Sequence, residues 1–532
     1  MTGLARESVD AVIVGGGHNG LVAANMLADA GWRTLVLESA DRVGGAIRSD
    51  ESLQAGFVTD WFSAFYPLAA VSPALRRLQL ERWGLTWTHA PTVLAHVFPD
   101  DRCAVLSRDR DVTAASLDSF AAGDGAAWLE LVSRFEAIKE PFLDAILGPF
   151  PPMRAAIRLA RRMGIADLLR FTRFAVQPVR RFGEETFAGE GATMLCAGNA
   201  LHTDLAPEAA GSAIYGWLLC MLAQTEGFPV PLGGSGAIVD ALVTRLVAAG
   251  GTVRCNSQVA SIDVADGRTT GITLSDGQRI EAHSVLADVG APQLYEDLIG
   301  ARHLPGRLLR DLEAFQWDSA TLKVNWALAG PIPWTAEGAR GAGTVHLGVD
   351  LDGLTRYATA LTLKQLPTRP FLLLGQMTTA DATRSPAGTE SAWAYTHVPN
   401  GQSLTADSVA RQVARLEATV ERQAPGFGAL VQARAVQTPT DLHDADANLF
   451  AGAVGGGTAA IHQELFFRPV PGLGRPETPI DGLYLASASA HPGGGVHGAP
   501  GSNAAQAALR RRGRTGRFHR AAIDAAYKRI YH

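Results

Sequence analysis

The stretch Asp10-Ala-Val-Ile-Val-Gly15-Gly-Gly17-His-Asn-Gly20-Leu-Val-Ala-Ala24 decides the fold of this chain. It runs from an apolar segment into the spacing Gly-x-Gly-x-x-Gly, and a second apolar segment, Thr34-Leu-Val-Leu37, then ends on Glu38. A strand, a glycine turn, a helix and a second strand that ends on an acid make up the βαβ unit that binds dinucleotides. The sequence therefore predicts a dinucleotide site at the start of a parallel sheet.

Each glycine of this turn has its own role. Gly15 allows the tight turn, Gly17 lets the backbone approach a pyrophosphate, and Gly20 lets the helix pack close to the strand. The helix N-terminus carries roughly +0.5 of partial charge, so it can hold a diphosphate without a lysine. Glu38 can accept hydrogen bonds from ribose hydroxyls, and its charge disfavours a 2′-phosphate. We expect Gly16, His18 and Asn19 to line the same turn.

A second glycine turn favours FAD over NAD as the expected cofactor. The residues after Glu38 read Ser39-Ala-Asp-Arg42-Val-Gly44-Gly45-Ala-Ile-Arg48. A simple NAD dehydrogenase does not need this turn, whereas a flavin dinucleotide that extends past the first helix does. Gly44 and Gly45 permit a second close backbone approach, and Arg42 or Arg48 can offer charge to phosphate. Surface exposure of both arginines is the alternative, because arginine is mostly exposed.

The C-terminal part of the chain is expected to complete the cofactor site that this unit begins. Asp481-Gly-Leu-Tyr-Leu-Ala486 reads as a short buried strand, and the glycine-rich run His491-Pro-Gly-Gly-Gly-Val-His-Gly498 follows it. Such backbone has few side chains to block it, so it can lie against a flat ring. An alanine-rich helix is expected to begin at Asn503 and to direct its N-terminus toward the cofactor. The residues expected to contact the cofactor here are Gly494, Gly495, Val496 and Asn503.

These segments resemble the flavin-dependent phytoene desaturase-like oxidoreductases. Within that family the chain is most similar to the pyridine nucleotide-disulfide oxidoreductase domain-containing protein 2 branch. The similarity is carried by Gly17-His-Asn-Gly-Leu-Val-Ala-Ala24, Phe467-Arg-Pro-Val-Pro-Gly472 and His491-Pro-Gly-Gly-Gly-Val496, with support from Pro231–Ala237 and Ala394–Pro399. The resemblance implies FAD as cofactor and a contact between the adenine and the backbone near Val259, although an ordinary sheet valine would fit there equally well.

The expected fold class is α/β (α+β overall), with a Rossmann-type FAD-binding domain and an interleaved substrate domain of mixed sheet and helices. The FAD-binding domain is assigned to residues 1–100, 231–295 and 475–532, and the substrate domain to residues 101–230 and 296–474. Within these limits, hydrophobic pattern and turn signals predict a set of elements. They are a helix over 239–249 and strands over 252–264, 269–274, 285–288, 320–328, 358–363 and 392–398.

Composition narrows the function classes. The 532 residues are 47% apolar and 19% charged, which is typical of globular proteins. The net charge of −5 does not indicate the basic surface that nucleic-acid binding requires. The four cysteines show no C-x-x-C pair and no zinc spacing, so we expect no metal and no dithiol chemistry. No apolar run is long enough to span a membrane, and no secretory signal precedes the first strand. We expect a cytoplasmic protein.

Three side chains are candidates for catalysis. Lys323 belongs to a strand in which polar and apolar residues alternate, and it is one of only four lysines. If the polar face lines the flavin cavity, Lys323 can hold a water there; a solvent-facing lysine is the alternative. His397 lies in a similar strand and His491 in the flavin-facing loop, where a histidine can orient substrate or move a proton. A purely structural role is the alternative for His397.

The segment Arg154–Arg181 carries eight arginines and one aspartate among apolar residues. It can form an amphipathic face that docks on anionic lipid and collects a hydrophobic substrate. A solvated helix or a subunit contact would explain the same pattern, and the sequence does not settle the oligomeric state.

The sequence therefore predicts an FAD-dependent oxidoreductase that takes a hydride from a small apolar or amphipathic substrate. No second dinucleotide turn is present, so the expected electron acceptor is oxygen, a quinone or a carrier. Two alternatives remain open. One is an enzyme similar to the flavin amine oxidases, with Lys323 as the water-holding residue. The other is a non-catalytic binding or regulatory protein that keeps the FAD fold.

Overall fold

Two seven-stranded sheets form the frame of the molecule, and the computed structural model describes residues 7–531. The first sheet begins with the predicted βαβ unit. Its strand order is β10 (Val259–Ala265), β11 (Arg268–Leu274), β12 (Arg279–Ala287), β1 (Glu7–Val14), β2 (Thr34–Leu37) and β9 (Thr252–Arg254), with β18 (Leu483–Leu485) paired to β12. The strands from β12 to β9 and β18 run parallel, whereas β10 and β11 are antiparallel additions.

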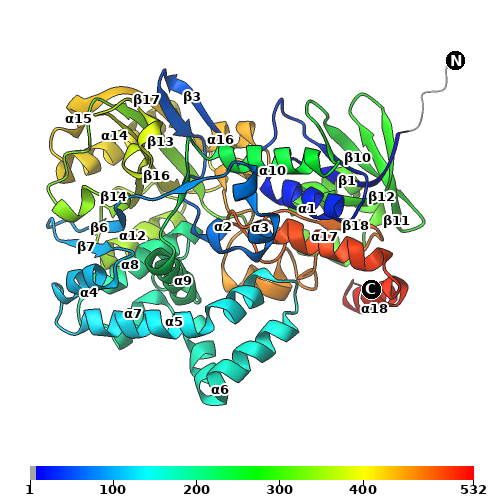
Figure 1. Ribbon diagram of the computed structural model, residues 1–532, viewed down its shortest axis with the longest axis horizontal. Coiled ribbons are helices and arrows are strands. Elements are labelled where there is room, and N and C mark those ends of the chain that lie inside the picture. Colours follow the sequence, from blue (N-terminus) through cyan, green and yellow to red (C-terminus); the bar gives the residue numbers. More distant parts are fainter. Residues whose placement is uncertain (1–6, 532) are drawn as a thin grey trace.

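The core of this unit follows from the two-residue period of β1. Ala11 and Ile13 face one side of the sheet, and Val12 and Val14 face the other. The first face is covered by α1 (His18–Asp29), α10 (Gly236–Ala248) and α17 (Ala499–Arg512), which supply an apolar layer. In Figure 1, α1 in blue and α17 in red lie side by side, so the two ends of the chain share one core.

The second sheet stands at the opposite end of the molecule (Figure 1). Its strand order is β17 (Val431–Gln437), β13 (Ala320–Leu328), β16 (Glu390–Val398), β15 (Leu372–Gln376), β14 (Ala342–Leu347), β6 (Thr92–Val97) and β7 (Cys103–Leu106). Two two-stranded sheets complete the strands: the hairpin of β3 (Ser49–Gln54) and β4 (Phe57–Asp60), and the pairing of β5 (Trp87–Thr88) with the distant β8 (Val230–Pro231). The strand β6 thus pairs in the second sheet, although it lies before the predicted boundary at residue 100.

Most remaining helices cover the second sheet or connect the two sheets. Between residues 100 and 230 they are α4 (Arg110–Asp118), α5 (Asp124–Leu147), α6 (Met153–Ala175), α7 (Val179–Thr186), α8 (Glu190–Ala200) and α9 (Ser212–Thr225). The others are α2 (Pro67–Val71), α3 (Pro73–Leu78), α11 (Gly306–Glu313), α12 (Leu351–Thr362), α13 (Met377–Ala380), α14 (Ala406–Gln423), α15 (Phe427–Leu430), α16 (Pro439–Ala445) and α18 (Gly516–Tyr531).

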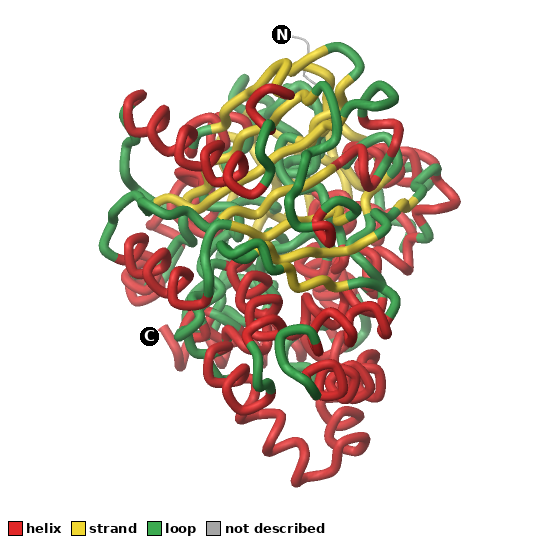
Figure 2. The backbone as a smooth tube through the Cα atoms, turned by 90° about the vertical axis from the view of Figure 1, so that its left-hand side faces the viewer, coloured by secondary structure: helices red, strands yellow, loops and turns green. Residues whose placement is uncertain are grey.

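The helix α6 projects from the body of the molecule. Its backbone leaves the helical conformation at Gly164 (φ 76°, ψ 166°), which bends it into two arms. Figures 1 and 2 show the bend as the lowest point of the molecule, with both arms rising from it. Within residues 7–531, no helix combines the length and the apolar character needed to cross a bilayer.

The α/β fold class is confirmed, and three predicted elements were wrong. Residues 358–363 form the end of helix α12, which begins where the Asp350 side chain accepts a hydrogen bond from the Gly353 N–H. The predicted strand over 252–264 is two strands, β9 and β10, which lie at opposite edges of the sheet. The last helix of the predicted cofactor site begins at Ala499, so Asn503 is an interior residue rather than its start.

Candidate functional site

The first glycine turn needs glycine at each of its three spaced positions. Gly15 has φ +96°, which side chains rarely adopt. A Cβ on Gly17 would lie 2.6 Å from Asp288 Oδ2, and a Cβ on Gly20 would lie 2.3 Å from the Gly15 carbonyl oxygen. Gly17 is also the N-cap of α1, which has neither a capping side chain nor an acid in its first turn. Within residues 7–531, the Gly20 N–H is the one first-turn N–H that meets a side chain, the Asp288 carboxyl, so the N–H groups of His18 and Asn19 can bind an anion.

Glu38 is held firmly beside this turn. Its Oε2 accepts a hydrogen bond from the Gly16 N–H at 2.8 Å, and its Oε1 accepts from the Ala40 N–H at 2.9 Å and from the Ser39 hydroxyl at 3.2 Å. Because β2 ends immediately before Glu38, the carboxylate lies at the carboxyl edge of the parallel strands, where this fold binds its ligands.

The second glycine turn packs directly on the first. The Gly44 N–H donates to the Gly16 carbonyl at 2.9 Å, and Gly44 and Gly45 have φ +129° and +53°. A Cβ on Gly45 would lie 3.2 Å from the Gly17 Cα. The two turns thus lie against each other, with partly accessible backbone at Gly15, Gly17 and Gly45 that an extended dinucleotide can approach.

The two candidate arginines of this segment differ in environment. The Arg42 side chain is 49% exposed and lies 3.7 Å from the Asp50 carboxylate. Arg48 is partly buried, donates to the Ala445 carbonyl at 2.5 Å and lies 5.1 Å from the centre of the Phe62 ring. Its Nε finds no partner among residues 7–531, and burial lowers the pKa of its guanidinium. Arg48 is therefore the arginine with unused donor capacity inside the site.

The C-terminal loop meets the first turn. His18 Nε2 lies 3.3 Å from the Gly495 carbonyl oxygen, and a Cβ on Gly501 would lie 1.9 Å from the Asn19 carbonyl oxygen. Asn19 is buried, and its side-chain Oδ1 has no partner within the described part of the chain. Gly494 lies against the Gly455 carbonyl, and Val496 packs on the core beneath α1. The structure thus brings the two predicted halves of the cofactor site together.

Two predicted cofactor residues lie apart from the turn. Asn503 is buried in the second turn of α17, and its Nδ2 points to the Leu147 carbonyl at 3.4 Å. Val259 is a buried residue at the start of β10, paired with Leu274. Its contact with an adenine stays a prediction.

Two acids at the turn were missed by sequence reasoning. Asp288 follows β12, and its Oδ2 accepts from the Gly20 N–H at 2.8 Å. Burial raises the pKa of Asp288 to about 8, and the neighbouring Asp446 and Glu38 carboxylates raise it further. Burial also raises the pKa of Asp446. Asp288 could have been identified from the sequence because it lies at the carboxyl end of a central strand. Asp446 lies in the connection after α16, far from the turn in sequence, so no pattern pointed to it.

Lys323 is buried against the end of β4. Its Nζ donates to the Asp60 carbonyl and, at 3.2 Å, to the Phe62 carbonyl, and it lies 5.5 Å from the centre of the Trp393 ring. Burial lowers the pKa of Lys323 to about 7, and the Arg384 charge lowers it further, against the opposing effect of Asp60. Because Phe62 also contacts Arg48, Lys323 is linked to the cofactor turn through one residue.

His397 pairs with an acid that the sequence did not reveal. Its Nε2 lies 3.0 Å from Asp204 Oδ1 and 3.1 Å from the Leu201 carbonyl oxygen. Burial raises the pKa of Asp204 to about 7 and lowers that of His397 to about 4. Asp204 follows the short 3₁₀ turn Leu201–Thr203 after α8, about two hundred residues from His397 in sequence, so no spacing pattern could have joined them.

His491 lies in the glycine-rich loop, packed edge-on against Phe150 with ring centres 5.6 Å apart. Neither ring nitrogen meets a hydrogen-bond partner within residues 7–531. Burial lowers the pKa of His491 to about 4, so the ring is neutral and keeps both nitrogens available.

Comparisons with known proteins agree with this geometry. The model of the flavin-containing amine oxidoreductase family matches residues 20–385. The mouse protein called pyridine nucleotide-disulfide oxidoreductase domain-containing protein 2 is 27% identical, over 96% of this chain and 94% of its own. A lycopene-forming phytoene desaturase from Pseudescherichia vulneris is 25% identical, over 94% and 98%. A solved structure of putrescine oxidase bound to putrescine has a TM-score of 0.58 at 17% identity, over 97% and 99% of the two chains.

Proposed function

The chain belongs to the family of flavin-containing amine oxidoreductases, and we propose that this FAD-dependent oxidoreductase dehydrogenates an apolar or amphipathic substrate. The observation that carries the proposal is the wall formed by Lys323, Trp393 and Tyr395, which meets the chain after β4 where Lys323 binds the Asp60 and Phe62 carbonyls. This wall combines aromatic surface with a single amine, and it adjoins a pair of uncharged proton-carrying groups, Asp204 and His397.

The residues of the site fit FAD. Three features point to a missing polar partner: the uncapped start of α1, the unpartnered Oδ1 of Asn19 and the unpartnered Nε of Arg48. The two stacked glycine turns give a cradle that any side chain on Gly17 would fill. We assign the diphosphate to the start of α1 with Arg48 nearby, and the adenosine ribose to Glu38. When bound, FAD supplies the acceptor for a hydride from the substrate.

The substrate wall lies on one face of two paired strands. In the register of β13 and β16, Lys323 stands opposite Tyr395 and Asn325 opposite Trp393. The Trp393 and Tyr395 rings are stacked, with centres 5.9 Å apart and planes 16° apart. Phe65 packs against Trp393 at 6.1 Å. An aromatic surface of this kind binds an apolar substrate and keeps water out.

Dehydrogenation of a C–C bond also releases a proton, and Asp204 is the best placed acceptor. It lies beside His397, which neighbours Tyr395 along the same wall with ring centres 5.5 Å apart. A carboxyl whose pKa lies near 7 can take a proton and return it without a large energetic cost. Asp204 Oδ2 accepts a hydrogen bond from the Ser319 N–H at 2.6 Å, whereas Oδ1 accepts none within the described residues and lies 3.0 Å from His397 Nε2.

A flavin amine oxidase is the second candidate. The observation in its favour is Lys323, whose pKa of about 7 leaves a neutral amine above neutral pH, and which can hold a water within the aromatic wall. Electrons would leave the reduced enzyme for oxygen, a quinone or a carrier in either case.

We also propose that α6 touches a membrane surface. Its exposed apolar side chains include Ile165 (82% exposed), Leu169 (67%) and Met153 (63%), and Ile165 lies at the projecting bend. Five of the eight arginines of Arg154–Arg181 pair with acids, so apolar contact rather than charge would dominate. Such contact would give the enzyme access to an amphipathic substrate held in lipid.

Anaerobic reduction of the bound FAD tests the proposed reaction. The purified holoenzyme is mixed without oxygen with amphipathic alkenes or with primary amines, and the 450 nm absorption of FAD is followed. Stoichiometric bleaching by an amphipathic hydrocarbon supports dehydrogenation. Bleaching by amines alone would select the amine oxidase, and an intact spectrum with every donor would contradict both reactions.

A further inference from the structure

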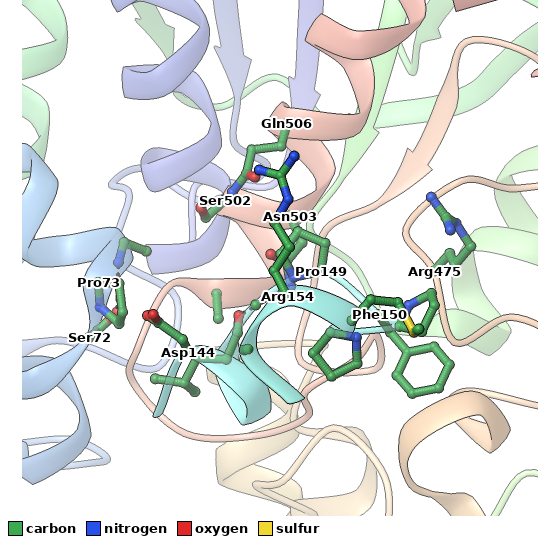
Figure 3. Close-up of a pocket in the computed structure, with 18 of the residues that line it drawn as sticks. Ser72, Pro73, Asp144, Pro149, Phe150, Arg154, Arg475, Ser502, Asn503 and Gln506 are labelled. Carbon is green, nitrogen blue, oxygen red and sulfur yellow. Dashed lines mark hydrogen bonds between the residues drawn. The ribbon is translucent and has the colours of Figure 1, made fainter. Parts of the chain in front are cut away.

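An open cleft of about 750 Å³ lies beside the cofactor site, between the helices of the substrate side and those on the first sheet (Figure 3). Its walls come from the end of α5, the start of α6, α3 and one side of α17. Of the residues predicted to bind the cofactor, only Asn503 lines it. We call this feature the arginine cleft, and it is distinct from the glycine turns.

The floor of the arginine cleft is apolar. It is formed by the connection between α5 and α6 and its neighbours, namely Leu147, Pro149, Phe150, Pro151 and Met153. The Phe150 ring lies with its centre 5.6 Å from that of His491, in the loop that carries Gly494 and Gly495. The floor is therefore one side chain away from the loop expected to face the flavin.

The rim of the cleft carries unpaired positive charge. Arg77 of α3, Arg154 of α6 and Arg510 of α17 come from three different helices, and within residues 7–531 none of them has an acidic partner. Two further arginines of the lining are neutralised, because Arg158 pairs with Asp144 and Arg475 with Glu477.

The other arginines of α6 and α7 differ in this respect. Arg170, Arg173, Arg180 and Arg181 pair with acids, whereas Arg161 and Arg162 form no ion pair within the described residues and lie outside the cleft. Unpaired arginines that converge on a cavity in a chain of net charge −5 create a local positive potential. Such a potential favours an anion over a neutral or cationic ligand.

The geometry of Arg154 shows where an anion would lie. Figure 3 shows its side chain directed from α6 toward α17, on the side that presents Ser502 and Gln506. A carboxylate or phosphate between them would accept charge-assisted hydrogen bonds from the guanidinium and further bonds from the hydroxyl and the amide. The apolar floor begins immediately below, at Pro149 and Phe150.

We propose that the arginine cleft binds the anionic head group of an amphiphile, whose apolar chain lies along the Pro149–Phe150–Met153 floor toward the flavin-facing loop. The head group is a phosphate or carboxylate. The identification of this amphiphile as the substrate rests on the proposed function, whereas its binding does not depend on turnover.

Calorimetric titration of the holoenzyme with dodecyl phosphate, below the concentration at which it forms micelles, tests the cleft. Inorganic phosphate and dodecanol are titrated in parallel to separate the head group from the chain. The variants are Arg154→Glu, Arg510→Glu and their combination. Arg529→Glu is the matched control, because Arg529 is an exposed, unpaired arginine that lies outside the cleft. The FAD absorption and the melting temperature of each variant show that it has folded.

We expect saturable binding of one dodecyl phosphate per chain, binding at least tenfold weaker in each single variant, none in the double variant and unchanged binding in Arg529→Glu. Equal binding by the double variant, or equal binding of dodecanol, would overturn the proposal. Equal binding of inorganic phosphate would overturn the role of the apolar floor. Binding as expected without any bleaching of FAD would leave the cleft standing and contradict only the identification of the amphiphile as substrate.

Discussion

Asp204 Oδ1 lies 3.0 Å from His397 Nε2, yet burial drives the pKa values of these two groups in opposite directions. The pKa of Asp204 is raised to about 7 and that of His397 is lowered to about 4. Between these values both groups are uncharged, so the contact is not an ion pair. A proton acceptor is therefore produced near neutral pH by the ionisation of Asp204 alone.

Replacement of Asp204 by asparagine should remove this acceptor. The rate of anaerobic FAD reduction in the unchanged enzyme should rise with pH through about 7, as Asp204 loses its proton. In Asp204→Asn the rate should fall by about 10²-fold, and the rise near pH 7 should disappear. Stopped-flow absorption at 450 nm measures both. The surface variant Asp352→Asn should behave like the unchanged enzyme, and a rise that persists in Asp204→Asn would rule out Asp204 as the acceptor.

Lys323 should make the stability of the protein depend on pH. Its pKa is about 7 in the folded protein and 10.5 as the ordinary value, so between these limits the unfolded chain binds more protons. The free energy of unfolding contributed by this group should therefore rise with pH, by about 1.4 kcal/mol per pH unit. Urea unfolding of the unchanged protein and of Lys323→Met from pH 7 to pH 9 measures the difference. Parallel stability curves would show that the amine stays protonated in the folded protein over this range, with a pKa close to its ordinary value.

Asp288 should make FAD binding weaken at alkaline pH. Its carboxyl is protonated below about pH 8, and above that value it places a negative charge under the expected diphosphate, beside Glu38 and Asp446 and with Arg48 as the nearby cation. The dissociation constant of FAD should then rise by up to about tenfold per pH unit above pH 8. In Asp288→Asn this rise should be absent. Fluorescence titration of apoprotein with FAD from pH 6.5 to 9.5 checks this, and identical pH profiles would contradict it.

The exposed apolar side chains at the bend of α6 should be required for binding to lipid vesicles. A charged side chain at the most exposed apolar positions removes favourable burial in the bilayer interface. Ile165→Asp with Leu169→Asp should therefore abolish co-sedimentation with vesicles that contain one third anionic lipid, while FAD content stays unchanged. Val112→Asp, at an apolar residue on α4 that is 46% exposed, is the control. Co-sedimentation equal to that of the unchanged protein would show that the exposed helix serves another contact, such as a second copy of the chain.

The parts of the fold that follow from local rules could be predicted from the sequence. The turn from Gly15 to Gly20 and the acid at Glu38 follow a fixed spacing that is visible in the sequence, although the atoms that a Cβ would meet at Gly15 and Gly17 belong to the distant Asp288. The strand over 320–328 matched β13 because polar and apolar residues alternate from Ala320 to Trp326. By contrast, residues 358–363 were assigned to a strand because their small and branched side chains hid the helix that the Asp350 cap begins.

The parts that depend on distant contacts could not be predicted. Asp204 becomes significant only because the turn after α8 reaches β16, and Asp446 only because the connection after α16 reaches the glycine turns. The same limit applies to Lys323. Its alternating strand suggested one polar and one apolar face and left a solvent-facing lysine open, but all nine residues of β13 are buried.

Counting FAD in the purified protein tests the central claim most directly, namely that the two ends of the chain hold one flavin dinucleotide between them. The protein should carry one FAD per chain by its 450 nm absorption. Gly17→Val should carry none while retaining its secondary structure, because its side chain would meet Asp288 and fill the cradle. Protein purified without flavin that also fails to bind added FAD, or a Gly17→Val variant that retains a full complement of FAD, would contradict the account.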